Sequence, residues 1–148
     1  MKKLLIVMMG LLLMVLGGCS LLNNAKDTIT YVNKATDYLG KATEFANDAP
    51  SLAQQAVNDP KAAKEFEAKL KDMKQEIQIF NNLQAPELAE DLHLQIVNQN
   101  TVFAQGIDLY LDNMVDGKLD PAILENTQIF QAIQEISSIT DQIKKLGQ

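Results

Sequence analysis

Hydrophobic residues recur at intervals of three and four along four long stretches of the chain, which predicts four amphipathic α-helices. They span about residues 22–47, 60–83, 86–116 and 121–146, and a short connecting helix is expected near residues 51–57. Alternating strand patterns are missing, so the predicted fold class is all-α. Helices of similar length joined by short linkers pack most simply as an antiparallel four-helix bundle, here about 38 Å long.

Capping residues, prolines and a glycine agree with these predicted helix boundaries. Asp59-Pro60 and Asp120-Pro121 each combine an N-cap residue with a proline at the first helical position. Gly117 fits the C-cap of the third helix. The sequence therefore predicts where three of the four helices begin or end.

Three polar residues interrupt the predicted core rows: Thr36 in the first helix, and Gln99 and Asn100 in the third. One interpretation is a small polar pocket inside the bundle. The other is a buried amide that fixes the register of the helices, as in coiled coils. The pattern alone leaves both open.

The N-terminus reads as a targeting segment. Lys2 and Lys3 precede an apolar run over residues 4–16, which as a helix of about 20 Å is too short for a hydrocarbon core of roughly 30 Å. A basic leader, a short apolar run and small residues are typical of a cleaved secretory signal peptide. An ordinary signal peptide with a chance cysteine and a buried N-terminal helix are the alternatives.

The segment Leu16-Gly17-Gly18-Cys19 resembles the lipobox of bacterial lipoproteins. The resemblance implies that a diacylglyceryl group with palmitate-like acyl chains is attached to the thiol of Cys19, and that a lipoprotein signal peptidase cuts between Gly18 and Cys19. It further implies location at the cell membrane, lipid-anchored on the extracytoplasmic face. The expected organisation is a signal peptide (1–18), a lipidated cysteine with a short tether (19–22) and one helical domain (23–148). This layout resembles small uncharacterised lipoproteins of Gram-positive bacteria.

The composition argues against one class of partner, nucleic acid. Removal of residues 1–18 takes away Lys2 and Lys3, leaving 11 basic against 19 acidic residues, so the formal charge moves from −6 to −8. The sequence contains no Arg and no Trp. Because an acidic chain repels polyanions and lacks the side chain that best binds phosphate, nucleic acid is not expected as a partner.

The sequence gives only weak signals for a metal-binding site. Glu90 and His93 form a Glu-x-x-His motif, but a di-iron site needs two such motifs and His93 is the only histidine. We therefore interpret His93 as a boundary or surface residue and expect neither a metal nor another cofactor. Asp108, Asp112 and Asp116 recur every four residues; a solvated acidic face is the simpler interpretation, with weak cation binding as the alternative.

The sequence offers few candidate catalytic residues, because the one cysteine is assigned to the lipid and the one histidine has no evident partner. The expected function is a non-enzymatic interaction module at the membrane surface, which binds an envelope protein or another copy of itself. The alternative is a carrier that holds a small apolar ligand between its helices. A leftover exposed apolar patch would favour the interaction module, and an unfilled cavity would favour the carrier.

Overall fold

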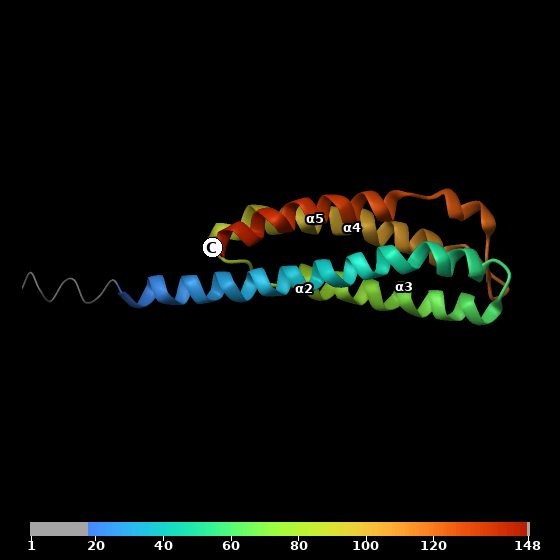
Figure 1. The fold of residues 1–148 in the computed structure, drawn as a ribbon, viewed down its shortest axis with the longest axis horizontal. Coiled ribbons are helices and arrows are strands. Elements are labelled where there is room, and N and C mark those ends of the chain that lie inside the picture. Colours follow the sequence, from blue (N-terminus) through green and yellow to red (C-terminus); the bar gives the residue numbers. More distant parts are fainter. Residues whose placement is uncertain (1–17, 148) are drawn as a thin grey trace, which may run out of the picture.

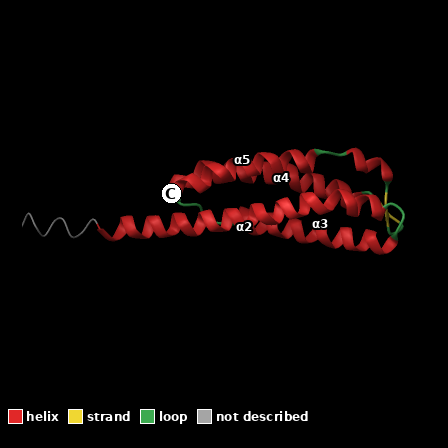
Figure 2. Ribbon diagram, viewed as in Figure 1, coloured by secondary structure: helices red, strands yellow, loops and turns green. Residues whose placement is uncertain are grey.

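A computed structural model describes the backbone of residues 18–147 and the side chains of residues 26–147. Four long helices dominate this part of the chain: α2 (Gly18–Ala56), α3 (Pro60–Asn81), α4 (Glu90–Asp112) and α5 (Gln128–Leu146). α2 packs against α3 and α5, and α4 packs against the same two helices, which closes an antiparallel four-helix bundle (Figures 1 and 2). The predicted fold class is confirmed.

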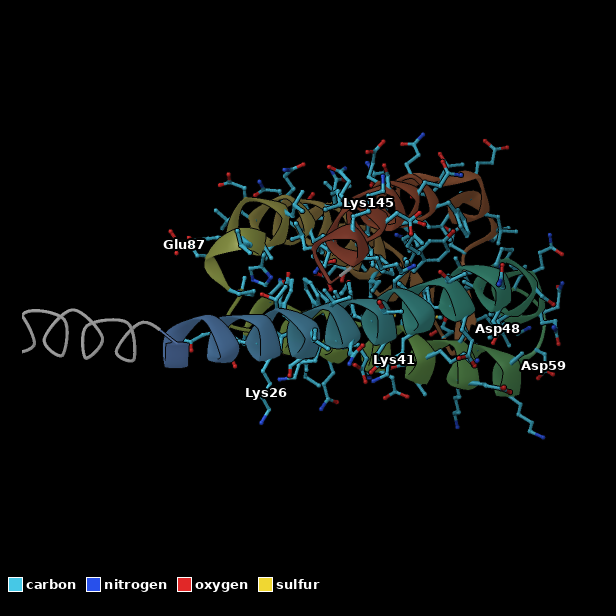
Figure 3. All side chains as sticks on the ribbon, turned by 60° about the vertical axis from the view of Figure 1, so that its left-hand side comes forward. Lys26, Lys41, Asp48, Asp59, Glu87 and Lys145 are labelled. Atoms are coloured by element: carbon cyan, nitrogen blue, oxygen red, sulfur yellow. The ribbon has the colours of Figure 1, made fainter. Side chains whose placement is uncertain are left out.

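The two ends of the bundle differ. We call the end where α2 and α4 begin the proximal end, and the opposite end the distal end. α2 extends beyond the other helices at the proximal end, and the C-terminus returns there (Figure 1). Glu87 and Lys26 lie toward the proximal end, and Asp48 and Asp59 lie toward the distal end (Figure 3).

The separate connecting helix expected near residues 51–57 is wrong, because α2 continues through Pro50 to Ala56. Pro50 removes one backbone N–H, yet its ring is exposed and does not interrupt packing. Ala49, Ala53 and Ala56 stay buried on the side that faces the core. Continuous burial therefore holds the helix together across the proline. At its other end α2 begins at Gly18, so residues 19–22, expected as a tether, are helical.

Two helix starts follow the predicted capping chemistry. Asp59 accepts a hydrogen bond from the backbone N–H of Lys61 at 2.8 Å and caps α3. Asp120 accepts from Ala122 N–H at 2.9 Å, but what it caps is the 3₁₀-helix η2 (Pro121–Glu125). α4 likewise follows a 3₁₀ turn, η1 (Glu87–Ala89). The third and fourth long helices are accordingly shorter than predicted.

A small hairpin replaces the predicted end of the third helix. α4 stops at Asp112, and β1 (Met114–Val115) pairs antiparallel with β2 (Lys118–Leu119). Asp116 and Gly117 have φ values of 50° and 72°, the backbone of a two-residue type I′ turn, which Asp-Gly favours. Gly117 is thus a hairpin residue and not a helix C-cap. Leu119 of this hairpin is buried and covers the distal end of the core.

The core is filled by side chains from all four helices. Phe45 and Phe103 meet with ring centroids 5.7 Å apart, and Phe66 meets Tyr110 edge to face at 5.5 Å. α5 contributes isoleucines at helical spacing: Ile129, Ile136 and Ile143 are fully buried. Outside the core, ion pairs join Lys41 to Glu76 and Lys69 to Asp48 between α2 and α3, and Lys74 to Asp108 between α3 and α4.

Candidate functional site: a buried polar cluster and an uncharged helix face

The three predicted polar core residues do not come together. Asn100 is fully buried in the centre of the bundle. Gln99 is only half-buried, because it lies 100° away from Asn100 around α4. Thr36 is exposed, and its hydroxyl donates back to the carbonyl of Val32 at 2.8 Å. A pocket lined by Thr36, Gln99 and Asn100 is therefore not formed.

Asn100 instead belongs to a polar cluster that crosses the bundle. The hydroxyl of Tyr38 donates to Asn100 Oδ1, and Asn100 Nδ2 donates to Asn81 Oδ1 at 2.6 Å. The hydroxyl of Tyr31 lies 3.0 Å from His93 Nδ1. We call these five residues the polar cluster. Every buried side-chain nitrogen and oxygen among the described residues has a hydrogen-bond partner, so the cluster is closed and satisfied.

Phe80 of α3 forms the apolar side of the polar cluster. Its ring stacks on Tyr38 with centroids 4.5 Å apart and a 24° interplanar angle, and it lies 5.2 Å from the ring of His93. These contacts surround the polar groups with aromatic surface. A buried network of this kind specifies one arrangement of the helices, because any shift would leave its polar atoms without partners.

The spacing of the polar cluster explains how the helices find this register. Tyr31 and Tyr38 are seven residues apart on α2, and His93 and Asn100 are seven apart on α4. α2 and α4 run in the same direction. When Tyr31 lies beside His93, Tyr38 therefore lies beside Asn100, seven residues further along each helix. Sequence reasoning identified Asn100 but missed the other four members, Asn81 among them; the signal for Tyr31, Tyr38 and His93 was this pair of equal intervals.

His93 is buried, so its interpretation as a boundary or surface residue is wrong. Burial lowers the pKa of its imidazole, and a hydrogen bond to the Asn81 backbone opposes the shift in part. A backbone carbonyl can only accept, so one ring nitrogen donates to Asn81 and Nδ1 of the neutral ring accepts from Tyr31. Burial also raises the pKa of the Tyr31 hydroxyl, which keeps it a donor.

The lowered pKa predicts a pH-dependent stability. In the unfolded chain the pKa of His93 is its ordinary value of about 6.5. Below that pH the unfolded state therefore binds more protons than the folded state does. Stability from neutral His93 is therefore complete above about pH 6.5 and falls as the pH drops toward the lower pKa of the folded state. The single histidine gives one imidazole Cε1–H resonance, whose NMR titration midpoint should lie below 6.5.

The matched variant is His93→Gln, which keeps an amide for hydrogen bonding but cannot titrate. The difference in unfolding free energy between wild type and variant should shrink from pH 7.5 to pH 5.5. A pH-independent difference, or a titration midpoint at or above 6.5, would contradict the assignment.

The predicted acidic row is divided among separate elements. Asp108 forms an ion pair with Lys74, Asp112 ends α4 and Asp116 occupies the hairpin turn. Within residues 26–147, no group of three or more His, Cys, Asp or Glu side chains is placed to hold a metal ion.

The outward side of α4 is free of charge along most of its length. Between Leu92 and Ile107 the sequence contains no Lys, Asp or Glu, and its one histidine is buried. Exposed residues at 4-3-4 spacing form one line along the helix, which we call the outer stripe: Leu94, Asn98, Thr101 and Gln105. α3 contrasts with it, since nine of its residues are charged: Lys61, Lys64, Glu65, Glu67, Lys69, Lys71, Asp72, Lys74 and Glu76.

Apolar side chains are exposed on and beside the outer stripe. Leu94 is 54% exposed, and Val102 and Leu109 are 38% and 37% exposed. One side of α4 is buried, with Ile96, Phe103, Ile107 and Tyr110, whereas the apolar residues on its other side are left at the surface or half-buried: Leu94, Val97, Ala104 and Leu111. The bundle's own helices therefore do not cover this face.

A groove of about 930 Å³ opens at the proximal end, between the start of α2, the α3–α4 connection and the end of α5. Its lining includes Tyr31, Leu146 and the exposed Ile29 and Leu88, together with charged Asp27, Lys34 and Glu87. This groove lies at the end of the bundle and not between the packed helices. None of the described helices is long and apolar enough to cross a membrane.

The predicted lipidation and cleavage residues lie at the edge of the described chain. The backbones of Gly18 and Cys19 form the first turn of α2, while their side chains and the preceding signal segment lie outside the described part. At about 1.5 Å per residue, α2 carries the chain some 15 Å from Cys19 to Ile29 at the groove. A continuous helix thus links the predicted anchor to the bundle.

Comparison with known proteins identifies a similar lipoprotein and a family. The chain is 33% identical over 148 residues to Uncharacterized lipoprotein YybP of Bacillus subtilis (strain 168), and the match covers 100% of both chains. This relative confirms the resemblance to small lipoproteins of Gram-positive bacteria. No solved structure matches the chain. A family model described as "Family of unknown function (DUF6376)" matches residues 31–146, nearly the whole helical bundle. The chain therefore belongs to the DUF6376 family.

Proposed function

We propose that this protein is a non-enzymatic interaction module, anchored through lipidated Cys19 on the extracytoplasmic face of the cell membrane, and that the uncharged outer face of α4 is its binding surface. The observation that carries the proposal is the exposure of Leu94, Val102 and Leu109 on a helix without charged residues from 92 to 107. Depletion of charge, more than apolarity as such, marks the centre of protein interfaces.

The remaining chemistry of the bundle supports a binding role over catalysis. Its one histidine accepts from Tyr31 inside the core and is not open to a substrate. The acidic and basic side chains elsewhere are spread over solvated helix faces.

A carrier role is the second candidate, and the groove at the proximal end is the observation in its favour. Exposed Ile29 and Leu88 among its lining would suit an amphiphile with an apolar chain. Titration with a fluorescent fatty acid tests this role. The carrier predicts saturable binding that Leu88→Glu weakens; binding that the substitution leaves unchanged would exclude the groove as the ligand site.

Site-specific photo-crosslinking in intact cells tests the interaction module. A benzophenone amino acid at Leu94 should give a discrete adduct on illumination, because the outer stripe would lie against its partner. Ile79 on charged α3 is the matched control, since it is an aliphatic residue of nearly equal exposure, 52%. No adduct from Leu94, or equal adducts from both positions, would overturn the proposal.

A further inference from the structure

We propose that the partner on the outer stripe is a second copy of this chain, and that the two α4 helices pack side by side in parallel with their proximal ends toward the membrane. This inference rests on the proposed function, because it names the partner of the same surface. Three features of α4 carry it: its lack of charge, the spacing of the stripe, and the direction of the helix relative to Cys19.

Charge decides where two copies can meet. The chain without its signal segment carries a formal charge of −8, so most encounters between copies are repulsive. The stretch Leu92–Ile107 is the longest part of α4 without a charged residue, and Asp91 and Asp108 bound it. The four residues of the outer stripe bring no charges face to face. Asp91 and Asp108 continue its line one step beyond each end, and Asp108 is paired with Lys74. Contact through α3 would instead require nine charged side chains to be paired or removed from water.

The outer stripe also has the spacing of a two-stranded helix seam. Leu94, Asn98, Thr101 and Gln105 follow one another at intervals of four, three and four, which corresponds to d, a, d and a of a heptad. Val102 is exposed beside this line, and Val97 is half-buried beside it. Asn98 then occupies an a position, where a pair of asparagines across the seam favours a parallel dimer in one register.

The anchor fixes the symmetry. Both copies would be held in one membrane plane by Cys19, at the end where α2 and α4 begin. A two-fold axis normal to that plane makes the α4 helices parallel and brings each stripe residue close to its own counterpart. The seam from Leu94 to Gln105 is only about 17 Å long, so its contact is small. Confinement to the membrane supplies the effective concentration that such a weak contact requires.

Cysteine crosslinking in membranes tests the arrangement. Cys19 is the only cysteine and its thiol would be acylated, so an introduced cysteine is the one free thiol of the full chain. Thr101→Cys places two thiols across the proposed axis and should give a disulfide-linked product of twice the protomer mass under mild oxidation. Gln75→Cys, exposed and uncharged on α3, is the matched control and should give no such product.

A second substitution guards against chance collisions. Asn98→Lys in the Thr101→Cys background sets two positive charges across the axis and should reduce the dimer at least about tenfold, since like charges at an interface cost several kcal/mol. Asn98 is exposed, so this change leaves the bundle folded, which circular dichroism checks.

The outcomes separate the two proposals. A dimer from Thr101→Cys that Asn98→Lys removes supports the second copy. Equal dimer from Thr101→Cys and Gln75→Cys, or dimer unaffected by Asn98→Lys, overturns it. If Leu94 gives a photo-adduct of any other mass while Thr101→Cys stays monomeric, the outer stripe remains a binding surface and the second copy is wrong. Neither adduct nor dimer overturns both.

Discussion

Replacing Asn100 with leucine should destabilise the bundle by about 2–3 kcal/mol, even though the side chains are similar in size. The substitution leaves the buried hydroxyl of Tyr38 without its acceptor and Asn81 Oδ1 without its donor. A buried polar group that loses its only partner costs roughly 1–3 kcal/mol. Urea unfolding of a form that lacks residues 1–19, followed by circular dichroism, measures the change.

A double-mutant cycle separates this network from simple packing. Tyr38→Phe removes the other half of the hydrogen bond, so the double variant with Asn100→Leu should recover part of the loss, because both partners are then apolar. Thr36→Val is the control: its side chain is exposed and hydrogen-bonded only to its own helix, so a change within about 0.5 kcal/mol is expected. A neutral Asn100→Leu, or strictly additive effects, would contradict the role given to the polar cluster.

Two glycine-to-alanine substitutions should change stability in opposite directions. Gly106 lies where α4 meets α5, and a Cβ there would come within 2.6 Å of Ile129 Cγ1. Ile129 is itself buried, so the overpacking should cost about 1–3 kcal/mol, less a helix-propensity gain of up to about 1 kcal/mol. The net effect expected for Gly106→Ala is a loss of about 1–2 kcal/mol.

Gly40→Ala is the matched control for Gly106→Ala. Gly40 also lies inside a long helix, but it is exposed and a Cβ there would meet nothing within 4 Å. Only the propensity term remains, so a gain of about 0.5–1 kcal/mol is expected. Both variants are compared by urea midpoint with wild type. Stabilisation by Gly106→Ala would mean that α4 and α5 do not approach each other as closely as described.

Much of the fold could be predicted because the core pattern is local. The helix predicted over residues 60–83 is α3 (Pro60–Asn81), whose buried Phe66, Leu70, Met73, Ile77 and Phe80 lie at intervals of four and three. The predicted helix boundaries were wrong where a local sequence signal and the tertiary structure favour different conformations. Pro50 looked like a helix break, but buried alanines on both sides of it keep α2 intact. Gly117 looked like a cap, but its positive φ serves a hairpin turn.

The polar cluster was harder to predict, because its hydrogen bonds join residues 62 positions apart on helices that do not follow one another. Helical periodicity says which side of a helix is buried, but not which partner it meets. Asn100 was identified as an anomaly in an apolar row, whereas the tyrosines looked like ordinary core residues. Thr36 was expected among the core positions of the first helix, but it lies on a side of α2 that the bundle leaves exposed.

Intact mass spectrometry of the membrane-extracted protein tests most directly that this chain is a lipoprotein held by Cys19. The protein is expressed in a bacterium with the lipidation enzymes, beside Cys19→Ser, which keeps the size of the side chain but removes the thiol. The wild type should lack residues 1–18, carry the added mass of acyl chains on Cys19 and sediment with membranes. Cys19→Ser should carry no acyl mass. An unacylated wild type, with or without cleavage, would contradict the anchor and remove the membrane confinement on which the paired α4 helices depend.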